Sequence, residues 1–255
     1  RVFDNGWEPI LELCAAPIEP LPGVDRAAPF DVRVIVPFMR PDNLERLLGS
    51  FYATTDGTVP ITLVVDNPLD LAGVDASILP TGKDRTGYAE KVNLAYRETD
   101  EPWLLVVGDD VEFHPGWLEE AIPFSFDWDV IGTNDSLPGR TRNPAVASGE
   151  HAAHFFIRRA YIEKYGANLD GPGEFIPPCY GHWFVDREII DLAKMRGTFI
   201  PCLRSVVEHH HPGYDRAERD DIYMEAIDTS DTDLRTYTER SLLLGFHRRY
   251  LGRRP

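Results

Sequence analysis

Strand and helix patterns alternate along residues 31–107, and this alternation constrains the fold more than any other feature. Residues 32–37 form a short, β-branched, apolar run, as expected of a buried parallel strand. Leucine and phenylalanine then recur at helical spacing over residues 44–51. Further strands are predicted at 61–65, 77–80 and 103–107, with a helix around 88–95. The sequence therefore predicts an α/β fold with a mainly parallel central sheet flanked by helices.

The rest of the chain is less regular. Strands are predicted at 129–132, 154–157 and 205–208, helices at 159–165 and 184–195, and a helical pattern from 217 onward, broken near Thr229 and Ser230. Five prolines before residue 30 leave no periodic pattern there. We therefore expect an extended N-terminal arm over 1–30, a main domain over 31–215 and a helical C-terminal extension over 216–255.

The composition excludes several classes of protein. The chain has 255 residues with 26 Lys and Arg against 42 Asp and Glu, a formal net charge of −16. A field of that sign repels nucleic acid, which disfavours general nucleic-acid binding. The longest apolar run, 103–107, is too short to span a bilayer, and the first residues lack a signal-peptide pattern. Three cysteines are too few for a disulfide framework, so we expect a cytoplasmic protein without a membrane span.

Polar residues follow three of the predicted strands, at 37–40, at 66–67 and at Asp109–Asp110. In open parallel sheets, ligands bind beyond the carboxyl ends of the strands, so these segments are expected to meet. Two adjacent carboxylates after a buried strand are costly unless a cation neutralises them. A hard divalent ion, Mg²⁺ or Mn²⁺, would do so. The alternative is a solvated turn.

Three consecutive histidines follow the predicted strand at 205–208. Because side chains alternate along an extended segment, His209 and His211 are expected to face one site and His210 to face away. Imidazole can complete a metal shell that carboxylates begin. A polar surface loop is the alternative, and the spacing does not support a zinc protease.

Asp186 precedes an apolar helical stripe. Its place in a first helical turn is explained by the helix dipole alone, or by a role as a general base. The spacing does not choose between the two. Nearby, Tyr180 and Trp183 would suit stacking against a sugar ring. No P-loop, dinucleotide-binding glycine motif or hydrolase elbow occurs in the chain.

Five segments, taken in order, resemble a known family. They are residues 32–38, 64–67, 91–93, 108–111 and 115–118. Together they look like a family 2-type glycosyltransferase of the GT-A fold, over roughly residues 31–212. The segments 186–188 and 209–212 resemble a branch found in bacteriophages and actinobacteria, which would place a phage-encoded protein in the host cytoplasm.

The resemblance implies a nucleotide-diphosphate sugar as donor, with a UDP-sugar as the first candidate, and Mn²⁺ or Mg²⁺ as cofactor. The acceptor is open: a glycan, a lipid-linked sugar, a protein or a modified DNA base. The implied donor-binding residues are Pro37 and Arg40 beside the nucleobase and ribose, Asp66 at the base, Gly87, Lys91 and Asn93 along the diphosphate or sugar, and Asp109 at the ribose or sugar.

The resemblance also assigns the reacting groups. Asp110 would hold the metal, His211 or His209 would close the metal site from the far side, and Asp186 would be the catalytic base, with Glu188 as the fallback. A single displacement would invert the anomeric centre.

The chain departs from the family pattern at Gly108, where the first of three acids is missing, and at 66–68 and Val185. A catalytically inactive sugar- or nucleotide-binding module, a nucleotidyltransferase and a metal-dependent hydrolase are the alternatives.

Overall fold

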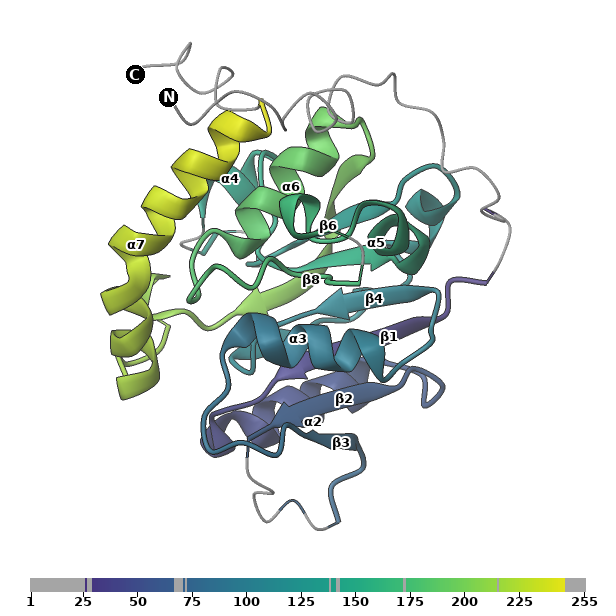
Figure 1. The fold of residues 1–255 in the computed structure, drawn as a ribbon. Coiled ribbons are helices and arrows are strands. Elements are labelled where there is room, and N and C mark those ends of the chain that lie inside the picture. The colour runs from purple at the N-terminus through teal and green to yellow at the C-terminus, as the bar shows by residue number, and fades with distance from the viewer. Residues whose placement is uncertain are drawn as a thin grey trace, which may run out of the picture.

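A computed structural model describes residues 26, 29–66, 71, 73–137, 139–140, 143–171, 173–214 and 216–245. In this part of the chain one eight-stranded sheet has the order β3-β2-β1-β4-β7-β6-β8-β5 (Figure 1). The strands are β1 Val32–Pro37, β2 Ile61–Val65, β3 Ser77–Pro80, β4 Trp103–Val106, β5 Val111–Phe113, β6 Val130–Asn134, β7 Phe155–Arg158 and β8 Phe199–His209. The arm predicted over 1–30 lies almost entirely outside the described residues.

The sheet is parallel at one end and mixed at the other. β3, β2, β1 and β4 run parallel, with Val34 of β1 opposite Ile61 of β2 and Leu105 of β4. β7 is antiparallel to β4 and β6, β8 is parallel to β6, and β5 is antiparallel to β8. The carboxyl ends of β1, β2 and β4 therefore lie at one edge, as the sequence predicted.

Helices cover both faces of the sheet (Figure 1). They are η1 Pro41–Asn43, α2 Leu44–Thr54, α3 Tyr88–Arg97, η2 Ile122–Phe126, α4 Pro144–Ala147, α5 Arg159–Tyr165, η3 Asn168–Asp170, α6 Val185–Met195, η4 Pro212–Tyr214 and α7 Asp221–Leu243. Alternate residues of each strand face opposite sides. Leu104 packs with α3 and α6, whereas Leu105 packs with α2. The strands are thus buried on both faces, which explains their continuous apolar sequences.

Trp117 anchors the second of these cores. Its fully buried ring stacks 5.9 Å from Phe156, and its indole Nε1 donates to Thr55 Oγ1 at 2.9 Å. Burying a side chain of this size contributes about 3 kcal/mol. The ring braces the segment that follows β5 against the sheet.

Most predicted elements are present, with two corrections. The predicted break near Thr229 and Ser230 is wrong, because α7 runs through both positions. Thr229 Oγ1 donates to Ala226 O at 2.9 Å, so its hydroxyl bonds within the helix instead of ending it. The three residues of β5 were not predicted. In the described part of the chain, no helix combines the length and apolar character needed to cross a membrane.

Candidate active site

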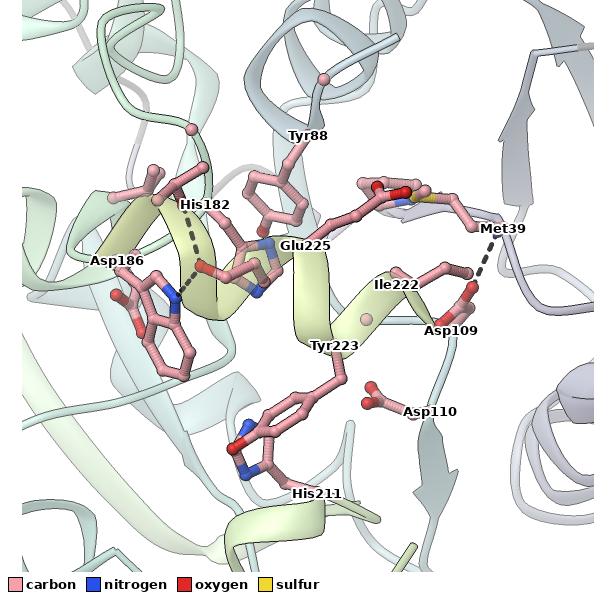
Figure 2. A pocket seen from close by; sticks show the side chains of 18 of the residues that line it. Met39, Tyr88, Asp109, Asp110, His182, Asp186, His211, Ile222, Tyr223 and Glu225 are labelled. Atoms are coloured by element: carbon pink, nitrogen blue, oxygen red, sulfur yellow. Dashed lines mark hydrogen bonds between the residues drawn. The ribbon is translucent and has the colours of Figure 1, made fainter. Parts of the chain in front are cut away.

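A pocket of about 350 Å³ opens at the carboxyl ends of β1 and β4 (Figure 2). Its walls come from segments far apart in the sequence. They are Pro37 at the end of β1 with Met39 and Arg40 after it, residues 85–88 at the start of α3, residues 108–110 after β4, residues 153–154 before β7, residues 181–186 at the start of α6, His209 and His211 at the end of β8, and residues of α7 between 222 and 229. Asp186 and the Asp109–Asp110 pair approach the pocket from opposite sides, with Tyr223 of α7 between them (Figure 2).

Asp109 holds the segment that follows β1. Its Oδ2 accepts from the backbone N–H groups of Met39 at 2.7 Å and Arg40 at 2.8 Å, and its Oδ1 accepts from Arg40 Nη1 at 2.8 Å. Burial and the neighbouring Asp110 raise the pKa of Asp109 above its usual range. Asp109 lines the pocket, but its carboxylate is engaged by three donors of the protein itself.

Asp110 turns toward the histidines of β8. Its Oδ1 lies 3.3 Å from His209 Nε2. Burial acts to raise the pKa of Asp110, but His209 and Arg40 together hold that pKa well below its usual range. Burial likewise opposes protonation of His209, yet Asp110 raises the pKa of His209 above normal. The two groups therefore form a partly buried ion pair.

Gly108 explains the missing acid of the motif. A Cβ at position 108 would lie 2.5 Å from Asp110 Oδ1, closer than real Cβ contacts allow. A side chain at 108 would therefore displace the flexible Asp110 carboxylate from its position beside His209.

The alternation predicted for the three histidines is confirmed. The rings of His209 and His211 are 4.9 Å apart and both line the pocket, whereas His210 Nε2 lies 3.0 Å from Glu112 Oε2 on the other face. Burial and the neighbouring His209 lower the pKa of His211 to about 4, so this ring is neutral at physiological pH. Its Nδ1 accepts from Gly213 N at 3.0 Å.

The pocket contains one carboxylate and two imidazoles from the predicted metal set, and carboxylate suits Mn²⁺ or Mg²⁺ whereas imidazole suits later transition metals, so the donor types do not select one ion. In the Asp110–His209 pair the anionic ligand is partly buried, and His209 would have to give up its proton before its nitrogen could bind a divalent ion. Asp110, His209 and His211 do not form a described group whose ligand atoms all lie within 4.8 Å of one another, so their role as metal ligands stays a prediction.

A different group of acid and histidine side chains lies close enough together to hold a metal ion. Among the described residues, Glu112, His114 and Glu208 place three such atoms within 4.8 Å of one another. Glu208 is fully buried and already neutralised by Arg140, at 2.5 Å, and by Arg216, at 3.3 Å. These ion pairs account for the Glu208 charge without a cation.

Asp186 occupies the first turn of α6 and lines the pocket. Its Oδ2 lies 3.1 Å from His151 Nε2, and its Oδ1 accepts from Arg187 N at 2.7 Å. Burial acts to raise the pKa of Asp186, but His151 and these hydrogen bonds lower it overall. Glu188, the alternative candidate for the catalytic base, is fully buried. It accepts hydrogen bonds from Tyr180 Oη at 2.6 Å and Arg240 Nε at 2.7 Å. It does not line the pocket.

Three predicted donor-binding residues, Asp66, Lys91 and Asn93, lie outside the lining of this pocket. Lys91 is fully buried, 3.0 Å from Asp66 Oδ2, and donates to Phe38 O at 3.2 Å. Asn93 donates to Ile176 O at 2.9 Å and accepts from the backbone N–H groups of Phe175 and Ile176 at 2.8 Å. Lys91 and Asn93 thus hold neighbouring backbone in place. Pro37, Arg40, Gly87 and Asp109 do line the pocket.

Sequence reasoning did not single out several residues around the pocket. His154 lies 5.0 Å from His209, ring to ring, and burial lowers its pKa to about 3. His151 contacts Asp186, and His182 lines the wall beside it. The available signal was three histidines between 151 and 182 without a periodic pattern. Tyr180, predicted to stack on a sugar, is instead buried.

No protein-family model matches the sequence, and no curated protein matches it. Among solved structures, TarS residues 1–349 of S. aureus in complex with UDP-GlcNAc has a TM-score of 0.56 at 13% identity, covering 85% of this chain and 71% of that one. GalNAc-T7 with UDP, GalNAc and Mn²⁺ has a TM-score of 0.53 at 15% identity, covering 70% of this chain.

The chain spans 36% of the longer TarS structure and 42% of GalNAc-T7. At these identities the likeness shows the fold, which is of the GT-A type.

Proposed function

We propose that the chain is a metal-dependent glycosyltransferase. It transfers a sugar from a nucleotide-diphosphate donor, a UDP-sugar first of all, to an acceptor hydroxyl, with inversion. The observation that carries the proposal is the pocket that brings Asp110, His209 and His211 opposite Asp186 on a GT-A-type fold. That solved structures of this fold hold UDP, UDP-GlcNAc or Mn²⁺ supports the choice of ligands.

Asp110, His209 and His211 are the residues that would hold the cation, and a bound cation would neutralise charge that builds on the leaving diphosphate. Arg40 and Arg85 line the same pocket, and their guanidinium groups, now paired with Asp109 and Asp220 and with Glu225, would meet phosphate oxygens there. Asp109 fixes Arg40 by a hydrogen bond and by its backbone contacts, so the guanidinium is oriented before any ligand binds.

Asp186 is the proposed base. Its lowered pKa leaves the carboxylate ionised at neutral pH, the form that can accept the proton of an acceptor hydroxyl, and also makes it a weaker base than an ordinary aspartate. His151 Nε2, at 3.1 Å, orients the carboxylate through its Oδ2. A single displacement with this base on the far side of the pocket from Asp110 inverts the anomeric centre.

Two isosteric variants test the proposal. Asp110→Asn is expected to abolish Mn²⁺-dependent binding of UDP in calorimetry. Asp186→Asn is expected to bind UDP as the wild type does but to release UDP from a UDP-sugar about a hundredfold more slowly, the usual contribution of a general base. Asp56→Asn, which removes an exposed carboxylate, is the matched control. Unchanged UDP binding in Asp110→Asn, or unchanged turnover in Asp186→Asn, contradicts the proposed roles.

A further inference from the structure

A buried carboxylate of α7 binds the loop that precedes Asp186. Asp233 is 1% exposed, and its Oδ1 accepts from Gly181 N at 2.9 Å. Its Oδ2 accepts from the backbone N–H groups of His182 and Trp183, each at 2.9 Å. Three successive amides on one carboxylate form an anion nest, and such charge-assisted hydrogen bonds are stronger than those between neutral groups.

The loop ends in a strained residue. Phe184 has φ 67° and ψ 0°. Among the described residues, it is the one non-glycine residue with a positive φ. Such a conformation persists only where surrounding contacts enforce it. α6 begins at the next residue, and Asp186 follows in its first turn. The backbone turn at Phe184 therefore sets the direction in which Asp186 enters the pocket.

Further contacts press this loop onto α7. A Cβ at Gly181 would lie 2.9 Å from Thr229 Cβ, so the loop and helix approach as closely as glycine permits. The Trp183 indole donates to Ala226 O at 2.6 Å, and the Phe184 ring stacks 5.1 Å from Tyr237. None of these contacts is with Asp186 itself, so α7 acts on Asp186 through the loop.

The same helix contacts the opposite side of the pocket. Asp220, the N-cap of α7, accepts from Arg40 Nε at 2.5 Å, and Arg40 in turn bonds Asp109. α7 thus links the side that carries Asp109 and Asp110 to the side that carries Asp186. This makes the helix a structural part of the pocket.

We infer that Asp233 is a positioning residue, which holds the loop of residues 181–184 so that Asp186 faces the metal and donor side of the pocket. The inference rests on the proposed function for the role of Asp186. Without the carboxylate, the three amides lose their common acceptor and Phe184 is free to leave its strained conformation. The pocket then keeps its donor-binding side but no longer presents the base correctly.

The experiment compares Asp233→Asn with Asp231→Asn in the full chain. Asp231 is an exposed residue of the same helix, so its variant removes one charge without touching the loop. The measurements are amide hydrogen exchange of the 181–184 segment, UDP affinity in the presence of Mn²⁺, and kcat and KM for UDP release from the UDP-sugar that stabilises the protein most. Asp233→Asn is expected to exchange faster at 181–184 and to lose about tenfold or more in kcat, with UDP affinity and donor KM within about twofold of wild type.

Gly181→Ala provides a second route to the same result. It keeps Asp233 and every charge but pushes the loop from Thr229, so faster exchange and lower kcat are expected here too. If Asp233→Asn does not fold, this variant decides the question.

Faster exchange with unchanged kcat overturns the inference, as does a loss of UDP affinity in proportion to kcat, which would reflect general damage. If the wild-type protein binds no nucleoside diphosphate, the proposed function is overturned. If the wild-type and Asp233→Asn proteins turn over equally well, only the inference about Asp233 is overturned.

Discussion

Three adjacent residues after β4 have three different tasks. Gly108 leaves room for the Asp110 carboxylate, Asp109 fixes the backbone of Met39 and Arg40, and Asp110 faces His209. Glycine at 108 therefore lets the Asp110 carboxylate lie where a Cβ of residue 108 would otherwise contact it.

Gly108→Ala tests this interpretation. The new Cβ would lie 2.5 Å from Asp110 Oδ1 and would push the carboxylate away from His209. We expect Mn²⁺-dependent UDP affinity, measured by calorimetry, to fall about tenfold or more while the protein stays folded. Gly57→Ala is the control, because a Cβ there meets no atom within 4 Å. UDP affinity equal to that of wild type would contradict the steric account.

Individual site residues were predictable where a local period governs them. The two-residue period of a strand is enough to place His209 and His211 together and His210 apart. His151 and His154 precede β7 and reach the pocket only through the tertiary fold. The backbone partners of Asn93 lie more than eighty residues away along the chain, so no local pattern distinguishes a donor-binding Asn93 from a structural one.

At the scale of elements, Asn93 ties α3 to the loop of Phe175 and Ile176. Asn93→Ala leaves buried backbone groups of both residues without their partner, which costs about 2–3 kcal/mol in the free energy of unfolding. Urea denaturation measures the loss. Because the amide does not line the pocket, UDP affinity of the folded variant should be unchanged. A variant of normal stability that loses UDP affinity would restore the donor-binding role predicted from the sequence.

Glu208 of β8 pairs with His114, Arg140 and Arg216. Burial alone would raise its pKa, but hydrogen bonds from His114 and Arg140 lower it below the usual value. A carboxylate with a lowered pKa in the folded state stabilises the fold above its unfolded pKa of about 4.3 and loses that contribution as the pH falls. Stability measured by urea denaturation should therefore fall in acid.

Glu208→Gln should remove this pH dependence. At pH 7 the variant is expected to be about 2 kcal/mol less stable than wild type, because Arg140 and Arg216 lose their anionic partner. Below about pH 4 the difference should shrink, since the wild-type carboxyl is then protonated as well. A difference in unfolding free energy that stays constant from pH 7 to pH 3 would contradict this assignment.

Helices and strands were predictable where one local factor, such as burial on both faces, determines their residues. β1, β2 and β4 are covered on both faces and read as unbroken apolar runs, whereas β5 has three residues and exists through its pairing with β8. The continuity of α7 across Thr229 was missed, because the Trp183 indole bonds Ala226 O and Gly181 packs against Thr229 there. Helix propensity depends on the local sequence and does not reflect such tertiary contacts.

At the scale of the whole molecule, the sheet brings the ends of β1, β4 and β8 to one edge, and α7 crosses that edge from the Arg40 side to the Asp186 side. The alternation of strands and helices predicted that the ends of β1, β2 and β4 would meet; the ends of β1 and β4 line the pocket, whereas Asp66 at the end of β2 does not. The sequence did not predict that the C-terminal helix would form a wall of the pocket, because α7 follows the last strand and has no repeating pattern that ties it to the sheet. The assignment to family 2 stays a prediction, since no family model matches.

The central claim is that this pocket binds a nucleoside diphosphate together with a divalent cation. Thermal unfolding with UDP, GDP, ADP, CDP and TDP, each with Mn²⁺, Mg²⁺ or EDTA, tests it most directly. A ligand at a hundred times its Kd stabilises the native state by about 2.7 kcal/mol, which raises Tm by about 5–10 °C in a domain of this size. We predict such a shift with UDP and Mn²⁺, lost in EDTA and in Asp110→Asn. If no nucleoside diphosphate raises the Tm of the folded protein with either metal, the pocket does not bind such a ligand with a cation as proposed.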